Sequence, residues 1–501
     1  MIKKWGLGAS SFQVIVVFRM IRIIFARCQN GYFVFYRYAV MKGLCSMAHK
    51  YNLVPQDVPR VQTKYRTIVT QLPVPESLAV FERLAAHEPI SMSGQPPVIW
   101  DRAEGIHVYD RWGNKWLDWS SCVLIANVGH GRPEICAALK AAIDKPLLAT
   151  YVFPHEGRAE LCKMLSETAP AGMDKVFLLS AGTEATENAV KLARTYGVRK
   201  YGPKKHVIVS FSGGFHGRTL GAQMVGGMSG QKDWIVELPG GFVHVPFPDG
   251  FINEDTSFEV FLKVLEDNDL NADDVAGVIT ESYQGIGPNF LPDEYARRLG
   301  QWCKSNDVVL FMDEVQAGFG RTGKFFCWEH YDLVPDLICC GKGISSSLPI
   351  SAVIGRNDIM DMYAPGSMTS THSASPLPVA AAIANLKILL EEKLTEHAAE
   401  MDGVLGGGLD ALQAKYPRHI GKSLHRGLVG GLLMVKPGTK DPDPETALAI
   451  NEKCMQKGLL MFAPVGLGGG CIKIAPPLIT PKDALEEGLA VLNEAFTEVL
   501  G

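Results

Sequence analysis

Five short runs of apolar and β-branched residues, separated by helical stretches, constrain the fold of this chain more than any other feature. Each run is bounded by Gly, Pro or polar residues. Strands that are apolar on both faces, with helices between them, are typical of a mostly parallel sheet that is covered on both sides. We therefore predict an α/β fold with strands near residues 176–180, 207–211, 275–280, 308–312 and 337–340.

The two ends of the chain have a different pattern. Residues 98–119 alternate apolar and polar residues around glycine-containing turns, which predicts a small antiparallel meander. Residues 377–405 form one long helical pattern, and strands are expected near 431–435 and 471–474. We expect a smaller α+β domain built from both chain ends, so that the domains are 47–125 (N-terminal part of the small domain), 126–370 (large domain) and 371–501 (C-terminal part of the small domain).

The first 46 residues form an atypical leader. Residues 1–50 contain several lysines and arginines but no Asp or Glu, and the apolar stretch 12–25 is interrupted by Arg19 and Arg22. That stretch is too short and too charged to predict a membrane span. Three interpretations stay open: upstream sequence included by a wrong start, with Met41 or Met47 as the true beginning, an Arg-rich targeting peptide, or a helix on a membrane surface.

Composition narrows the class of protein. The formal net charge is -4, and the basic residues form no stripe with interleaved aromatics, so nothing indicates binding to nucleic acid. The 11 cysteines contain no CxxC pair, which favours reduced thiols over disulfides or a metal site. We expect a cytoplasmic enzyme without a metal, or an organellar one if the leader is a targeting peptide.

An acidic pair ends one of the predicted buried strands. The run VVLFMDEVQAGFGRTG over 308–323 places Asp313 and Glu314 where the strand stops. Ligands of open α/β sheets bind beyond the carboxyl ends of the strands, so a carboxylate there can pair with a cation such as a protonated pyridine nitrogen. An acidic residue at a strand end is also common as a cap or turn residue, so this run alone decides nothing.

A lysine between two glycines ends the next strand. The run LICCGKGISSSL over 337–348 contains Gly341, Lys342 and Gly343. Glycines let a backbone approach a ligand closely, and desolvation or a neighbouring positive charge can deprotonate the lysine for covalent chemistry. The alternative is a solvated loop lysine.

Two further segments have the features of an anion site and a planar-ring site. Residues 180–185 (SAGTEA) join a strand to a helix, and the first backbone N–H groups of that helix would hold a phosphate. Residues 211–218 (FSGGFHGR) follow another strand and offer an aromatic ring beside a pair of glycines, suited to stack on a planar cofactor. Either segment alone is common in α/β proteins.

Together, in this order and spacing, these segments resemble the class III (ω-) aminotransferases. The resemblance runs from about residue 98 to residue 500 and is most specific in DEVQAGFGRTG, whose Asp313 precedes Lys342 by 29 positions. It implies the type I fold of enzymes that use pyridoxal 5'-phosphate (PLP), with a mostly parallel sheet in a large domain. It also implies a homodimer that shares its active sites and acts on a small-molecule amine.

The resemblance assigns a role to each matching residue. Lys342 would bind PLP covalently and later move a proton, and Asp313 would pair with the pyridine nitrogen so that the ring acts as an electron sink. Thr371 would reach the phosphate across the subunit interface. The remaining cofactor contacts implied are Gly182 and Thr183 at the phosphate, Phe215 stacked on the ring and followed by His216, Glu281 near the cofactor, and Gln316 near its phenolic oxygen.

Two positions depart from the family pattern. Lys473, in CIKIAPPL, stands where the family usually has an arginine for a substrate carboxylate, and Ile286 stands where ω-amino acid enzymes often carry a glutamate. Arginine grips a carboxylate at two points, whereas lysine supplies one rotatable point charge. The two changes are either coupled or independent drift.

The departures leave two reactions open. We expect an aminotransferase acting on a small primary amine that bears an anionic group, with a keto acid such as pyruvate as acceptor. The alternative is a PLP-dependent ammonia-lyase that eliminates from a hydroxylated aminoethylphosphonate or an amino-alcohol phosphate. A non-catalytic protein of the same fold is disfavoured because Lys342, Asp313 and Thr371 are all present. Trp119, Ser121 and Cys122 are expected to border the substrate, although Trp119 is equally consistent with core packing.

Overall fold

The computed structural model describes residues 50–501. The leader predicted at residues 1–46 lies outside the described residues. Within the described part, no helix is both long and apolar enough to cross a membrane.

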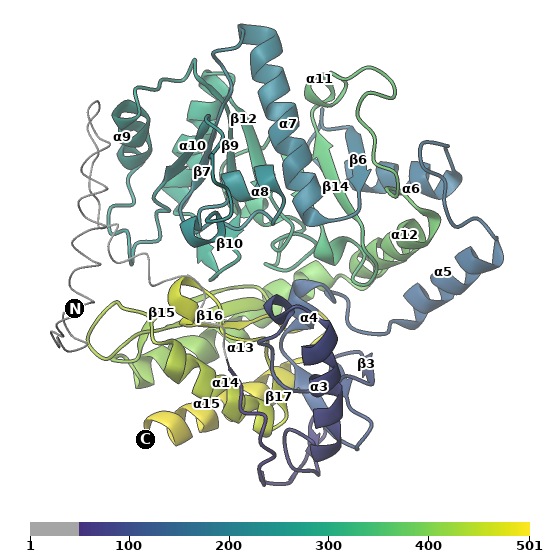
Figure 1. Cartoon of the computed structure of the whole chain (residues 1–501), viewed down its shortest axis with the longest axis vertical. Coiled ribbons are helices and arrows are strands. Elements are labelled where there is room, and N and C mark those ends of the chain that lie inside the picture. The colour runs from purple at the N-terminus through teal and green to yellow at the C-terminus, as the bar shows by residue number, and fades with distance from the viewer. Residues whose placement is uncertain (1–49) are drawn as a thin grey trace, which may run out of the picture. The chain divides into compact units, whose positions relative to one another are not determined.

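A seven-stranded sheet forms the centre of the large lobe (Figure 1). Every pairing in it is parallel except the two made by β14, which runs antiparallel to both neighbours. The prediction of an α/β fold with a mostly parallel sheet is therefore confirmed. In spatial order the strands are β6 (Lys175–Leu179), β14 (Ser351–Gly355), β13 (Leu337–Cys340), β12 (Val309–Asp313), β9 (Val275–Glu281), β7 (Val207–Phe211) and β8 (Phe242–Val245).

Helices cover both faces of this sheet, because successive side chains of each strand point to opposite faces. On β9, Ile279 belongs to the core formed with α7 (Gly182–Tyr201). Val278, its neighbour, belongs to a second core formed with the helices on the other face. Those helices are α9 (Glu259–Asp267) and α10 (Asp293–Ser305). Burial on both sides explains why the strands read as continuous apolar runs.

The long helical pattern predicted over residues 377–405 is two helices rather than one. α12 (Pro376–Glu391) and α13 (Leu394–Lys415) are separated at Lys393, whose φ is +51°. A left-handed residue ends the run of helical dihedrals and redirects the chain. Neither Gly nor Pro marks this break, so the apolar periodicity alone did not reveal it.

The smaller lobe combines both ends of the described chain. Its antiparallel meander has the predicted turns, and β17 (Leu459–Leu460), from the C-terminal part, pairs in parallel with β5 (Lys115–Asp118), from the N-terminal part. The other strands of this sheet are β1 (Val61–Gln62), β2 (Thr67–Ile68), β3 (Arg102–Glu104) and β4 (His107–Tyr109).

A separate three-stranded antiparallel sheet carries Lys473, a predicted substrate-binding residue. It consists of β15 (Ile420–Arg426), β16 (Val429–Met434) and β18 (Cys471–Ile474). The sheet packs with α13 and α14 (Pro444–Gln456), and α15 (Lys482–Leu500) packs with these two helices. The remaining helices are α3 (Leu78–His87), α4 (Ser121–Leu124), α5 (Pro133–Asp144), α6 (Glu156–Ser166), α8 (Leu220–Val225) and α11 (Asn357–Met360). A short hairpin joins β10 (Tyr283–Gln284) to β11 (Asn289–Phe290).

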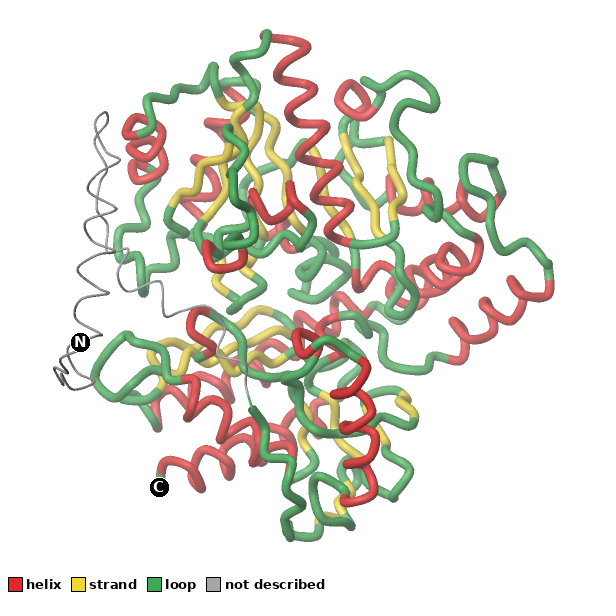
Figure 2. Tube along the Cα trace, viewed as in Figure 1, coloured by secondary structure: helices red, strands yellow, loops and turns green. Residues whose placement is uncertain are grey.

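The carboxyl ends of the parallel strands face the smaller lobe. In Figure 1 the β10 hairpin, which directly follows β9, lies at the side of the large sheet nearest the three-stranded sheet. Figure 2 shows connecting loops, with short helical turns among them, at this edge. Ligand sites of open α/β sheets lie at this kind of edge.

Candidate active site

Three neighbouring parallel strands bring the key residues to one edge of the sheet. The register pairs Asp313, the last residue of β12, with Glu281 on β9 and with Cys339 on β13. Lys342 follows three residues after Cys339. Residues that are far apart in sequence therefore meet because the strands end together.

Lys342 occupies a short, strained turn after β13. Its φ is +43°, a left-handed conformation that costs an L-residue about 1–2 kcal/mol. Asn385 Nδ2 donates to Gly343 O at 2.9 Å, and Asn127 packs so closely on the turn that a Cβ on Gly343 would lie 2.5 Å from its Nδ2. Such strain is a common feature of functional sites, where the surroundings hold the residue in place.

The amine of Lys342 lies in an environment that favours its neutral form. Burial lowers the pKa of Lys342, and the charges of Asp313 and Glu281 oppose that shift. No hydrogen-bond acceptor contacts this amine among residues 50–501. A neutral, unpartnered amine is the form in which a lysine acts as a nucleophile or proton acceptor.

Asp313 is held by two donors. Its Oδ2 lies 2.8 Å from His216 Nδ1, and its Oδ1 accepts from Val315 N at 3.0 Å. Burial opposes the charged form of His216, but the hydrogen bond and charge of Asp313 raise the pKa of His216 above its ordinary value. These two hydrogen bonds fix the orientation of the Asp313 carboxylate at the strand end. The carboxylate can still accept a hydrogen bond from a cationic donor.

Glu281 links the loop after β7 to the hairpin after β9. Its Oε2 accepts from Phe215 N at 2.9 Å, and its Oε1 accepts from Gly285 N at 2.7 Å. Burial raises the pKa of Glu281. The carboxyl group therefore fixes the backbone on both sides of the site.

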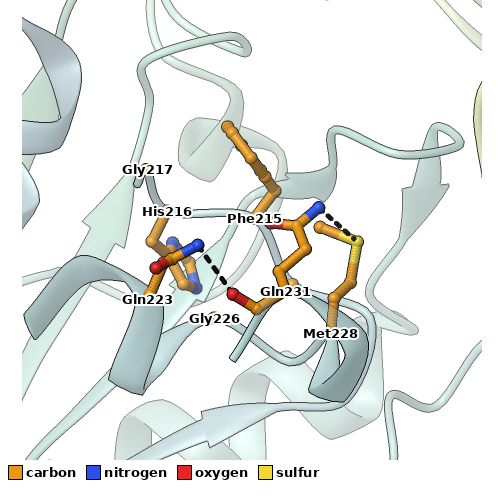
Figure 3. A pocket seen from close by; sticks show the side chains of 8 residues that line it. Phe215, His216, Gly217, Gln223, Gly226, Met228 and Gln231 are labelled. Carbon is orange, nitrogen blue, oxygen red and sulfur yellow. Dashed lines mark hydrogen bonds between the residues drawn. The ribbon is translucent and has the colours of Figure 1, made fainter. Parts of the chain in front are cut away.

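Phe215 and His216 leave their loop in different directions (Figure 3). His216 points to Asp313, whereas the half-buried ring of Phe215 has Arg218 5.7 Å from its centroid. A small cavity adjoins this loop, and it is lined by Gly214, Phe215, His216, Gly217, Gln223, Gly226, Met228 and Gln231.

The start of α7 offers free backbone donors beside this loop. The N–H groups of Gly182 and Thr183 have no acceptor among the described residues, whereas those of Ser180 and Ala181 donate to Glu184 Oε2. Thr183 Oγ1 lies 2.8 Å from Thr219 Oγ1. A helix start with unpartnered N–H groups binds a phosphate well.

Glycines at this junction allow a close approach of three segments. A Cβ on Gly217, whose φ is +125°, would lie 2.2 Å from Thr183 Oγ1. A Cβ on Gly182 would lie 2.7 Å from Val315 Cγ1, and one on Gly341 would lie 3.1 Å from the same atom. Val315 was not among the predicted site residues, although its place between Asp313 and Gln316 in the motif was a usable signal.

Lys473 reaches the site from the smaller lobe. Its side chain, 1% exposed, donates to Gly285 O at 2.7 Å and to Gln316 Oε1 at 2.8 Å. Burial lowers the pKa of Lys473 to about 7. Ile286 follows Gly285, and its Cδ1 would lie 3.3 Å from a Cβ on Gly213. Lys473, on β18, therefore contacts the β10–β11 hairpin at the residue next to Ile286.

Two predicted residues lie outside this cluster. Trp119 is fully buried, and a Cβ on Gly488 would lie 2.2 Å from its ring, so the ring packs against α15. Thr371 lies on an exposed loop and makes no hydrogen bond with the other site residues within the described chain.

Ser121 and Cys122 belong to a left-handed turn beside the strand that carries Lys473. All four residues of α4 have positive φ angles between +46° and +64°. Ser121 Oγ donates to Ala475 O at 2.6 Å, and the side chain of Cys122 is exposed. The strain of four left-handed residues without glycine was not visible in the sequence.

The fold and this arrangement have counterparts among known proteins. The family described as Aminotransferase class-III matches residues 90–496. The chain belongs to this family. It is therefore a PLP-dependent enzyme, since class-III aminotransferases use this cofactor.

Curated relatives cover most of the chain. A 4-aminobutyrate aminotransferase of Mycobacterium leprae is 32% identical over 442 residues, which is 85% of this chain and 97% of the relative. A 5-aminovalerate aminotransferase of Pseudomonas putida is 32% identical over 431 residues, or 84% of this chain and 98% of the relative.

Solved structures agree with the fold. An (S)-enantioselective omega-transaminase from Thermomicrobium roseum has a TM-score of 0.78 at 25% identity, covering 85% of this chain and 99% of that one. The ornithine aminotransferase of Toxoplasma gondii ME49 has a TM-score of 0.75 at 25% identity, covering 84% and 95%. The expected PLP type I fold is confirmed.

The residues present fit PLP. The amine, which has no acceptor among the described residues, suits the aldehyde of PLP. The carboxylate at the strand end suits a protonated pyridine nitrogen, and the two unpartnered N–H groups at the helix start suit the phosphate. These groups belong to Lys342, Asp313, Gly182 and Thr183.

Proposed function

We propose that the protein transfers the amino group of a small primary amine bearing an anionic group, such as an ω-amino acid, to a keto acid. The observation that carries this proposal is the meeting of Lys342, Asp313 and Glu281 at the strand ends of a class-III aminotransferase. The relatives named for 4-aminobutyrate and 5-aminovalerate support an amine with a carboxylate at its other end.

When bound, PLP supplies an aldehyde for the amine and an electron-poor ring that acidifies a carbon-bound proton of the substrate. Lys342 then has two tasks, to hold the cofactor covalently between turnovers and to carry the proton at Nζ during them. Its lowered pKa supports both, because each task needs the neutral amine.

The neighbouring residues orient and charge the site. Asp313, held by His216 and Val315 N, offers a carboxylate to the ring nitrogen. Phe215 would cover one side of the ring, and Glu281 holds the backbone of that residue. These fixed groups need no rearrangement when charge develops, which is the main electrostatic contribution to catalysis.

A homodimer would complete the phosphate site. Gly182 and Thr183 would bind the phosphate within one chain, and we propose that Thr371 of one copy serves the site of the other. An exposed apolar segment supports such an interface: Tyr151 in this segment is hydrogen-bonded to Thr369 of the Thr371 loop at 2.9 Å. Its exposed apolar members are Leu147, Leu148, Tyr151, Val152 and Phe153.

Lys473 and Ile286 bear on the choice of substrate. Lys473 donates to Gly285 O of the hairpin and would offer a substrate one cationic group, and Ile286, the next residue of the hairpin, is apolar. A single cation suits a small monoanionic substrate better than it suits a substrate that needs two parallel hydrogen bonds to one residue. Elimination of ammonia, the alternative reaction, has no support from three curated relatives of this chain, which are named as 4-aminobutyrate, 5-aminovalerate and acetylornithine aminotransferases.

The test is to incubate the purified PLP-loaded protein with 4-aminobutyrate or 5-aminovalerate, with and without pyruvate or 2-oxoglutarate. We expect alanine or glutamate to form only when the keto acid is present, with no net release of ammonia. Ammonia and an aldehyde formed without any keto acid would contradict the proposal and favour a lyase.

A further inference from the structure

Lys473 directs its hydrogen bonds into the protein. Its ammonium donates to Gly285 O and to Gln316 Oε1, and it lies 5.1 Å from the centroid of the Tyr283 ring. An ammonium has three N–H donors, so two of them are used within the protein and one is left for a substrate. We call Lys473, Gly285 and Gln316 the Lys473 clamp.

Gly285 closes the clamp sterically. A Cβ on Gly285 would lie 2.7 Å from Gln316 Nε2 and 2.8 Å from Glu281 Oε1. Its own N–H donates to Glu281 Oε1 at 2.7 Å. The Gln316 amide is therefore confined by a backbone that leaves no room for a side chain, as well as by the Lys473 hydrogen bond.

The chemistry of the ammonium determines which way the Gln316 amide faces. The two ends of a glutamine amide have nearly the same shape, so packing alone does not distinguish oxygen from NH₂. Lys473 Nζ is the donor in this bond, so the atom of Gln316 that faces it is the oxygen. The NH₂ end then faces away from Lys473, as a donor.

We propose that Lys473 is a positioning residue that fixes the polarity of the Gln316 amide, so that the cofactor meets a hydrogen-bond donor at this position. The proposal rests on the proposed function, in which Gln316 lies beside the phenolic oxygen of PLP. A donor there stabilises the ionised oxygen. Lys473 thus acts on the cofactor through Gln316, in addition to any contact of its third N–H with substrate.

The test is a double-mutant cycle read from the pH midpoint of the visible absorbance band of the PLP-loaded protein, measured without substrate. Lys473→Met and Gln316→Met each remove the donor at the phenolic oxygen and should raise the midpoint by about one pH unit. The double variant should shift no further than the larger single shift, because both changes break one unit.

A buried lysine elsewhere supplies the matched control. Lys205, 2% exposed, donates to the carbonyl oxygens of Asn306 and Ala272 at 2.8 and 3.3 Å. Lys205→Met removes a buried lysine with a similar pair of bonds and should leave the midpoint unchanged. A shift in this control equal to that of Lys473→Met would overturn the proposal.

Three other outcomes would also overturn it: an unchanged midpoint in Lys473→Met, shifts that add fully in the double variant, or a wild-type protein with no visible band. Additive shifts would mean that Lys473 acts as a charge independent of Gln316, and they would leave the aminotransferase proposal intact. An absent band would contradict both proposals. If Lys473→Met does not bind PLP, Gly285→Ala displaces the Gln316 amide without removing a charge, and an unchanged midpoint in that variant would refute the clamp.

Discussion

Asp313 shows how a single side chain depends on its neighbours. Its carboxylate is held by His216 and Val315 N, and it lies at the end of a buried strand. Asp313→Asn keeps the shape of the side chain but removes the negative charge that would keep the ring nitrogen of PLP protonated. We expect kcat to fall on the order of a hundredfold or more at saturating PLP, with Asp249→Asn as the control, because the Asp249 carboxylate accepts from the backbone of its own turn. A kcat within twofold of the wild type would contradict the assigned role.

His216 makes the stability of the site depend on pH. Asp313 raises the pKa of His216 above 6.5. The His216–Asp313 pair therefore adds to the free energy of unfolding fully below pH 6.5, and this contribution is lost as pH rises through the folded-state pKa of His216. We expect His216→Gln to destabilise the PLP-free protein more at pH 5.5 than at pH 9, as measured by denaturant unfolding. An equal loss at both pH values would refute this coupling.

Lys473 should have the opposite pH dependence. Burial lowers its pKa from 10.5 to about 7. Between these pH values the unfolded chain binds a proton at Lys473 that the folded chain does not, and below pH 7 the folded chain bears the full cost of burying the ammonium. The wild type should therefore gain stability relative to Lys473→Met as pH rises from 7 to 9, by roughly 1–3 kcal/mol. Denaturant unfolding of both PLP-free proteins measures this, and parallel pH profiles would contradict it.

At the scale of elements, the site depends on how closely the loop after β7 approaches the start of α7. Gly217→Ala forces a Cβ against Thr183, which lies 2.2 Å from that position. Gly172, whose φ is also positive but whose Cβ would meet nothing within 4 Å, is the matched control. We expect Gly217→Ala to weaken PLP binding at least about tenfold and Gly172→Ala to leave it unchanged, since only the first combines strain with a clash. Equal affinities of the two variants in a PLP titration would contradict this account.

The elements themselves were predictable to different degrees. Buried parallel strands are apolar on both faces, so β7, β9, β12 and β13 stand out in the sequence and the Asp313–Lys342 spacing followed from them. β14 was not predicted, and its antiparallel direction depends on pairings that no local pattern encodes. The partners of Lys473 were also missed, because they lie 188 and 157 residues away along the chain.

At the scale of the whole molecule, two copies are expected to share each site. The exposed apolar segment 147–153 adjoins the Thr371 loop, so a charge placed there should break the dimer and weaken PLP binding together. Phe153→Asp, at a side chain 72% exposed, should give a monomer in light scattering, whereas Leu262→Asp on α9 should stay dimeric. A monomeric wild type, or a dimeric Phe153→Asp protein, would contradict the shared site.

The most direct test of the central claim is to locate the cofactor on the chain. Borohydride reduction of the PLP-loaded protein should fix PLP to one lysine, and peptide mass spectrometry should find it on Lys342. Lys342→Ala should lose both the label and the visible absorbance, and its kcat should fall at least about a hundredfold. A label on any other lysine, or undiminished turnover by Lys342→Ala, would contradict the account.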